Sequence, residues 1–351
     1  MLGQDGQVKL WARGNLGLYE KKKEKRKKKK KRREKKKERK KRKKKMSFKG
    51  TGKLKGVYTA LVTPFSADGS SVDWDSYERL VKFQIEGGVA GVVACGTTGE
   101  SPTLSTEEKR KAISEAVRIT RGTGVIVIAG TGSNDTAATV EDTAWARDAG
   151  ADMALVVNPY YNRPSQAGLL AHFRAVLRGA PGIPILLYNI PGRSGVTLTV
   201  DTLEALSKEE GIVGVKDATG TMDYACEVGV RCGSSLTVLS GDDGLTLPFM
   251  SLGATGVVSV VSNLYPAATV AMVAKGLAGD FSGALASHKA LWPFFKGAFI
   301  ETNPVPIKTA LAASRIISHA TVRLPLAPLE PASASKLESI VSTTAKNLAS
   351  I

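Results

Sequence analysis

Cysteine and histidine are scarce in this sequence of 351 residues, which contains three of each. Three cysteines at irregular spacing, Cys95, Cys226 and Cys232, do not make a disulfide framework and are typical of a reducing compartment, so we expect a cytoplasmic protein. Neither a Cys-x-x-Cys nor a His-Glu-x-x-His pattern occurs. We therefore predict no structural zinc site and no other metal.

Long apolar runs are also missing. No stretch approaches the ~18 uninterrupted apolar residues of a membrane-spanning helix, and residues 1–20 have no apolar core of the kind found in secretory signals. We expect no membrane partner. Apolar residues still make up 42% of the chain, which is enough to build a large core.

Positive charge is abundant but confined to one segment. Residues 21–45 contain 22 Lys and Arg against 3 Glu, a local charge of +19, so with a formal net charge of +18 the other 326 residues carry about −1. A run of like charge without apolar periodicity predicts a disordered Lys-rich tail over residues 1–52. Three explanations stay open: a polybasic tether, a neutral appendage, or a non-native extension before a true start at Met46. We predict no nucleic-acid-binding face on the folded part.

Eight short β-branched runs follow, with helix-length segments between them. They occupy residues 57–62, 92–95, 125–129, 153–157, 185–188, 212–216, 236–240 and 257–260. This unbroken β-α alternation indicates parallel pairing through right-handed crossovers, and eight repeats predict an α/β fold, the (β/α)8 TIM barrel, over residues 53–278. The alternative, an open doubly wound sheet, lacks its Gly-x-Gly-x-x-Gly turn, because Thr63-Pro64-Phe65 stands in that place.

Helix signals support this division. An amphipathic pattern predicts a helix over 74–86, and helix starts are indicated by Ser105, by Asn134 or Asp135, and by Ser165. Further helical patterns near residues 266–277, 282–295, 306–314 and 335–349 extend beyond the eighth strand. We expect the patterns after residue 278 to form a C-terminal helical extension over residues 279–351.

Active sites of such barrels lie at the carboxyl ends of the strands, so the residue that ends each run is informative. The sixth run ends in Lys216, whose amine could attack a carbonyl if burial keeps it neutral, or which could simply reach water. The fifth ends in Tyr188, with Arg193 five residues later. A phenol beside the lysine could move a proton, and an arginine can bind a carboxylate with two hydrogen bonds.

Three other runs also end in polar segments. Gly-Thr-Thr-Gly-Glu at residues 96–100 could bind an anion through its amides and hydroxyls, or could be an ordinary tight turn. The fourth run leads into an aromatic loop at residues 158–164. The seventh is followed by Gly241 and then by Asp242 and Asp243, whose carboxylates suggest helix capping more than a metal site.

Together these segments resemble the superfamily of dihydrodipicolinate synthases and N-acetylneuraminate lyases, which are class I aldolases that use pyruvate. The likeness covers residues 55–328. It rests on Gly-Thr-Thr-Gly-Glu, Tyr-Asn-Ile-Pro from Tyr188 and Gly-Val-Lys-Asp-Ala-Thr-Gly around Lys216, in that order, and on segments 303–308 and 324–328.

The resemblance implies catalytic roles for four residues. Lys216 would form a Schiff base with pyruvate. The proton relay would consist of Tyr188, Thr97 and Tyr161, the last contributed across a subunit interface. No cofactor would be needed, because the imine itself serves as the electron sink.

The resemblance also implies how substrates are bound. Thr98 would hold the pyruvate carboxylate, Arg193 would receive the carboxylate of the second substrate, and Gly241 and Val258 would complete the site. The doubled threonine and Arg193 resemble the synthase branch. That branch condenses pyruvate with L-aspartate 4-semialdehyde to 4-hydroxy-tetrahydrodipicolinate in lysine (diaminopimelate) biosynthesis, and a homotetramer built from two dimers is expected.

Two other functions stay open. One is a sister pyruvate aldolase acting on 4-hydroxy-2-oxoglutarate, a 2-keto-3-deoxy-sugar acid or N-acetylneuraminate. The other is a nucleic-acid-tethered protein with an inactive barrel, which only residues 21–45 support.

We predict weak or absent feedback inhibition by lysine. In lysine-inhibited members of the superfamily a histidine and a glutamate contribute to the allosteric pocket, and Lys109 and Ala138 occupy the matching positions here. Lys109 would repel the ammonium group of lysine, and Ala138 offers no carboxylate to bind it. Steady-state turnover measured against added lysine checks this, and inhibition at submillimolar lysine would contradict it.

Overall fold

The structure is a computed structural model that describes residues 54–351. The predictions of a disordered Lys-rich tail over residues 1–52 and of a start at Met46 lie outside the described residues. Among residues 54–351, no helix is both long and apolar enough to cross a membrane.

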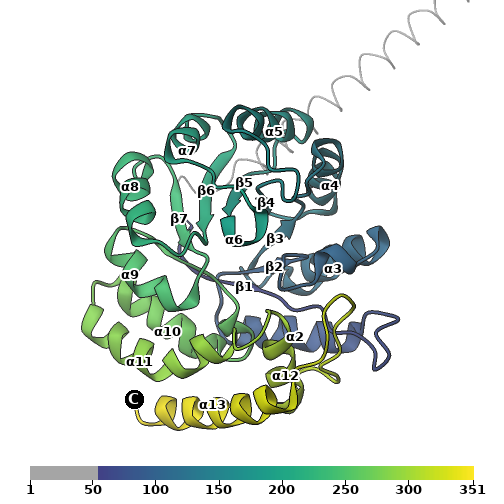
Figure 1. The fold of residues 1–351 in the computed structure, drawn as a ribbon, viewed down its shortest axis with the longest axis vertical. Helices are drawn as coiled ribbons and strands as arrows, with labels where there is room; N and C mark the ends of the chain where they lie inside the picture. The colour runs from purple at the N-terminus through teal and green to yellow at the C-terminus, as the bar shows by residue number, and fades with distance from the viewer. Residues whose placement is uncertain (1–53) are drawn as a thin grey trace, which may run out of the picture. The chain divides into compact units, whose positions relative to one another are not determined.

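Eight parallel strands form a closed barrel in which each strand pairs with the next in the chain and the last pairs with the first (Figure 1). The strands are β1 (Gly56–Ala60), β2 (Gly91–Ala94), β3 (Ile126–Gly130), β4 (Met153–Val157), β5 (Ile185–Asn189), β6 (Ile212–Asp217), β7 (Thr237–Ser240) and β8 (Gly256–Ser259). The predicted (β/α)8 barrel is confirmed, and barrel closure excludes the open doubly wound sheet.

Helices follow the strands along the chain. They are α2 (Trp74–Glu86), α3 (Thr106–Thr120), α4 (Thr136–Ala149), α5 (Gln166–Gly179), α6 (Pro191–Ser194), α7 (Val200–Ser207), α8 (Met222–Cys232), α9 (Thr246–Ser251) and α10 (Pro266–Leu277). The predicted bounds of 74–86 and 266–277 agree with α2 and α10. Two helices, the short α6 and then α7, separate β5 from β6.

The predicted helix starts are confirmed by their caps. Ser105 and Glu108 form a reciprocal capping box at the start of α3, and the Asp135 side chain accepts from the amide of Ala137 at the start of α4. Ser165 accepts from the amide of Gly168 at the start of α5. These side chains satisfy amides that have no partner within the helix, so they fix where each helix begins.

The core has an inner and an outer part, because side chains alternate between the two faces of each strand. Inward-facing residues fill the barrel, among them Val93, Ile128, Leu186 and Leu239. Outward-facing residues pack against the surrounding helices in two larger clusters. The barrel is therefore packed with side chains, which leaves its rim as the place where a site can form.

The chain continues past α10 as the predicted C-terminal helical extension. It contains α11 (Phe281–Gly297), α12 (Val305–Ala313) and α13 (Pro331–Ala349). α11 packs between α10 and α13 on one side of the barrel, as Figure 1 shows. The long segment between α12 and α13 returns to the loop after β1, where Arg323 Nε donates to the carbonyl of Gly69 at 2.8 Å.

A close backbone approach joins β3 to the segment that follows β2. A Cβ atom built on Gly130 would overlap the carbonyl oxygen of Cys95 and lie 2.7 Å from its carbonyl carbon and 3.0 Å from the amide nitrogen of Gly96. Backbone atoms cannot rotate away from such a contact. Only glycine therefore allows β3 to lie this close to the polar turn after β2.

We expect Gly130→Ala to lower the free energy of unfolding by about 1–3 kcal/mol, the usual cost of overpacking. Gly192→Ala is the matched control, because a Cβ at Gly192 meets nothing within 4 Å. Urea unfolding followed by circular dichroism measures both. Equal midpoints for the two variants would contradict the prediction.

Candidate active site

The carboxyl ends of β5 and β6 bring a lysine and a tyrosine together. Lys216 lies opposite Tyr188 in the register of the two strands, and its Nζ is 4.0 Å from the centroid of the tyrosine ring. Both residues are buried, with 6% and 5% of their surface exposed. The alternative of a strand-end lysine that reaches water does not fit this burial. A buried amine beside a phenol can attack a carbonyl and exchange protons with its neighbour.

Gly241 leaves room for the lysine side chain at the end of β7. A Cβ atom at this position would be 3.1 Å from Lys216 Cε, 3.0 Å from the carbonyl oxygen of Asp217 and 2.7 Å from Ala218 Cβ. Val258 on β8 is buried and belongs to the same inner cluster as Tyr188. Gly241 thus lies beside Lys216 at the rim, and Val258 lies with Tyr188 in the interior of the barrel.

The two threonines lie in a tight turn after β2. Its amides close the turn, with Gly99 N donating to Gly96 O at 3.1 Å and Glu100 N donating to Thr97 O at 3.0 Å. Thr97 is half-buried and Thr98 is buried. The turn therefore presents two hydroxyl groups at the carboxyl end of the barrel.

Asn303, from the C-terminal extension, joins Thr98 to Arg193. Its Nδ2 donates to Thr98 Oγ1 at 3.0 Å, and its main-chain carbonyl oxygen accepts from Arg193 Nη2 at 3.3 Å. Arg193 itself is exposed. Its guanidinium therefore lies at the outer side of the site, where it could meet an entering carboxylate.

Tyr161 is a predicted site residue for which the described part of the chain shows no contact with the other predicted site residues. It lies in the loop after β4 with 90% of its surface exposed and a left-handed backbone, φ 72°. Its ring therefore makes little contact with the chain that carries it.

A buried charge cluster supports the threonine turn from behind. Glu100 Oε1 and Lys308 Nζ are 2.7 Å apart, with 1% and 0% of their side chains exposed, and Glu100 Oε2 accepts from the amide of Arg323 at 3.0 Å. Burial lowers the pKa of Lys308 to about 8, and the Glu100 carboxylate opposes this shift. The sequence alone predicts no role for the side chain of either residue.

A layer of buried polar groups lies behind the rim. Asn158 Nδ2 donates to Asn189 Oδ1 at 3.0 Å. Asn189 Nδ2 donates to the carbonyl of Leu198 at 3.2 Å, and Asn189 Oδ1 accepts from the amide of Leu198 at 3.0 Å. Asp217 accepts from Thr219 N and Oγ1 at 2.9 and 2.7 Å, while burial raises the pKa of its carboxyl against the effect of these bonds. These bonds fix the loops that follow β5 and β6.

Of the paired aspartates after β7, Asp242 caps a short helical turn, as expected, whereas Asp243 binds amides of the segment after β8. Asp242 Oδ1 accepts from the amide of Gly244 at 2.8 Å, and Asp243 Oδ2 accepts from the amides of Val260 and Val261 at 2.9 and 3.2 Å. Burial raises the pKa of Asp243 to about 6, although these bonds oppose the shift. Within residues 54–351, no group of three or more His, Cys, Asp or Glu side chains is placed to hold a metal ion.

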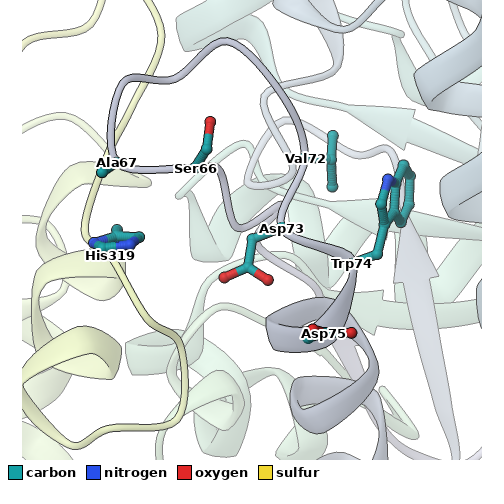
Figure 2. A pocket seen from close by; sticks show the side chains of 7 residues that line it. All are labelled: Ser66, Ala67, Val72, Asp73, Trp74, Asp75 and His319. Carbon is teal, nitrogen blue, oxygen red and sulfur yellow. The ribbon is translucent and has the colours of Figure 1, made fainter.

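A surface pocket of about 450 Å³ lies elsewhere, between the loop after β1 and the segment that follows α12 (Figure 2). Asp73 and Asp75 line it on one side and His319 on the other. Asp73 already caps α2 by accepting from the amide of Ser76 at 3.0 Å. None of the predicted site residues lines this pocket, so it is separate from the predicted site.

Lys109 and Ala138, which bear on the predicted response to lysine, lie on α3 and α4, two helices that pack together. Both residues are half-buried. Their effect on lysine binding stays a prediction.

Known proteins share this fold and much of this sequence. A 4-hydroxy-tetrahydrodipicolinate synthase from Prochlorococcus marinus (strain MIT 9303) is 50% identical over 273 residues, which cover 78% of this chain and 89% of that protein. The 4-hydroxy-tetrahydrodipicolinate synthase structure from Methylacidiphilum fumariolicum SolV has a TM-score of 0.82 at 45% identity, covering 85% of this chain and 98% of that one.

A dihydrodipicolinate synthase from Acinetobacter baumannii, solved in complex with pyruvate, has a TM-score of 0.81 at 40% identity, covering 83% of this chain and 99% of that one. The model of the dihydrodipicolinate synthetase family matches residues 53–344. This match spans the whole barrel and most of the C-terminal extension. The chain belongs to the dihydrodipicolinate synthetase family.

Proposed function

We propose that this chain condenses pyruvate with L-aspartate 4-semialdehyde through a Schiff base on Lys216, giving 4-hydroxy-tetrahydrodipicolinate for lysine biosynthesis. The observation that carries the assignment of the reacting group is the buried amine of Lys216, 4.0 Å from the Tyr188 ring at the carboxyl end of the barrel. The identity of the two substrates is inferred from family membership.

The first half of the reaction activates pyruvate. The Lys216 amine attacks the ketone carbon, C2, and the resulting carbinolamine loses water to form an imine. Tyr188 moves protons in this step and then takes one from the methyl group, which leaves an enamine. The electron pair of the broken C–H bond is held by the imine nitrogen, so carbon becomes the nucleophile.

The second half joins the two substrates. The enamine carbon attacks the aldehyde carbon, a C–C bond forms, and the alkoxide takes a proton from the relay. The substrate amine then adds to C2, closes the ring and releases the Lys216 amine. One water is lost in total, at imine formation.

Substrate binding follows from the groups around the lysine. Thr98 holds the pyruvate carboxylate by its hydroxyl, and Arg193 receives the carboxylate of the aldehyde substrate from its exposed position. Gly241 leaves room beside the lysine, and Val258 forms an apolar wall. Thr97 continues the proton relay from Tyr188.

Tyr161 completes that relay in a second subunit. Its exposure of 90% supports this role, because a tyrosine so little covered by its own chain is free to enter a neighbouring site. The active form is then at least a dimer, and we infer a homotetramer of two dimers.

We place the reaction in the cytoplasm, since all three cysteines are free. Catalysis is assigned to residues 53–278, with 279–351 as the C-terminal extension.

Borohydride reduction in the presence of pyruvate should attach the pyruvate carbons to Lys216, because the imine is reduced to a stable amine. Peptide mapping by mass spectrometry locates the adduct. Lys216→Arg is the control, since it keeps a cation but offers no amine able to form the imine. An adduct on any other lysine, or none, would overturn the assignment.

Turnover of L-aspartate 4-semialdehyde with pyruvate should exceed cleavage of 4-hydroxy-2-oxoglutarate, 2-keto-3-deoxy-sugar acids and N-acetylneuraminate. The reason is that Arg193 provides a cation for the second carboxylate. A preference for one of the other substrates, measured as kcat/KM, would reassign the chain to a sister aldolase.

Gly241→Ala should lower kcat/KM by about 10- to 100-fold, because a new methyl group would displace the Lys216 side chain. The double variant Ala218→Gly/Gly241→Ala removes the nearest contact and should recover part of the loss. Steady-state kinetics of both variants, with thermal unfolding as a check on folding, tests this. Wild-type kinetics for Gly241→Ala would show that the space beside the lysine is not needed.

A further inference from the structure

α12 carries a lysine that no step of the reaction uses, yet it is wholly buried. Lys308 Nζ donates to Glu100 Oε1 at 2.7 Å and to the carbonyl of Thr63 at 2.8 Å, and it lies 4.1 Å from the centroid of the Phe65 ring. Removing two charges from water is costly, and such a pair is often no more stabilising than apolar residues of the same size. The pair therefore calls for a role other than stability.

Glu100 ends the turn that presents the two threonines, and its backbone is left-handed with φ 53°. This conformation is uncommon for residues other than glycine, so it needs support from its surroundings. Lys308 provides that support through the Glu100 carboxylate. The turn is also tied to the β1 loop, because Thr63 Oγ1 donates to the carbonyl of Gly99 at 2.7 Å.

The same segment of the chain contacts the turn a second time. Asn303 precedes α12, and its Nδ2 donates to Thr98 Oγ1 at 3.0 Å. A hydroxyl that accepts this bond still has its own hydrogen to donate. Asn303 therefore leaves the Thr98 hydroxyl as the donor that a carboxylate requires.

Resting on the proposed function, we propose that the Asn303–Lys308 segment sets the conformation of the turn from Thr97 to Glu100, with Lys308 and Asn303 acting as positioning residues for the pyruvate carboxylate. Lys308 fixes the far end of the turn through Glu100. Asn303 orients the hydroxyl at its centre. Neither side chain needs to touch the reacting atoms.

The variants separate positioning from folding. Lys308→Met leaves the Glu100 carboxylate buried without its partner, so it should be destabilised as well as impaired. The double variant Glu100→Gln/Lys308→Met removes both charges and should unfold at a higher temperature than Lys308→Met, although the carbonyl of Thr63 still loses its donor. Lys275→Met is the matched control: Lys275 on α10 is part-buried and donates to Ser287 Oγ at 3.2 Å, away from the turn.

Two measurements are made on each folded variant, well below its unfolding temperature. One is the steady-state KM for pyruvate and for the aldehyde. The other is the pyruvate concentration that gives half-maximal borohydride trapping on Lys216. We expect both pyruvate values to rise by about 10- to 100-fold in Lys308→Met and in the double variant, since small misplacements of binding groups have effects of this size. The aldehyde KM should change much less.

A double variant that regains wild-type stability and wild-type pyruvate dependence would overturn the proposal, because the pair would then be structural only. Asn303→Ala decides the matter if neither Lys308 variant folds, since it leaves no charge unpaired: raised pyruvate values support the proposal and unchanged values overturn it. Absence of a pyruvate adduct in the wild type is a different result, which refutes the proposed function itself.

Discussion

The hydrogen bonds that pair β8 with β1 are the constraint on which the rest of the molecule depends. Because all eight strands run parallel, closure brings their carboxyl ends to a single rim. Residues that are distant in the chain then become neighbours because of their positions at the strand ends. The pairing of Tyr188 with Lys216 is more local, because the adjacent strands β5 and β6 carry these residues at the same level. Closure places this pair on the same rim as the turn that follows β2.

A barrel alone does not complete the site, since a turn between a strand and a helix has more freedom than the strand itself. The turn after β2 is held by the backbone of β3 on one side and by groups from the C-terminal extension on the other. The extension is therefore part of the site's architecture. This explains how a helix outside the eight repeats, α12, comes to contain a fully buried cation.

The eight strands were predictable because β-branched runs and capping residues are local signals, and the neighbours Tyr188 and Lys216 follow once the strands are counted. The links from Thr98 to Asn303 and from Glu100 to Lys308 were not, because they join residues 205 and 208 positions apart. Segment 303–308 is part of the resemblance to the superfamily, but its residues indicate only that a helix begins there and not which side chains it contacts. The role of Tyr161 is harder still to predict, since neither the sequence nor the fold of one chain shows whether a second subunit contacts an exposed side chain.

The position of Asn303 and Lys308 late in the chain has a consequence for biosynthesis. A ribosome releases all eight strands, with Lys216 among them, before it releases α12. The nascent barrel can thus pair its strands before residues 303–308 contact the threonine turn. A chain that terminates early would retain the amine and the tyrosine beside it but would lack the segment that orders the threonine turn. The threonine turn therefore gains these contacts only late in synthesis, after the eight strands have been released.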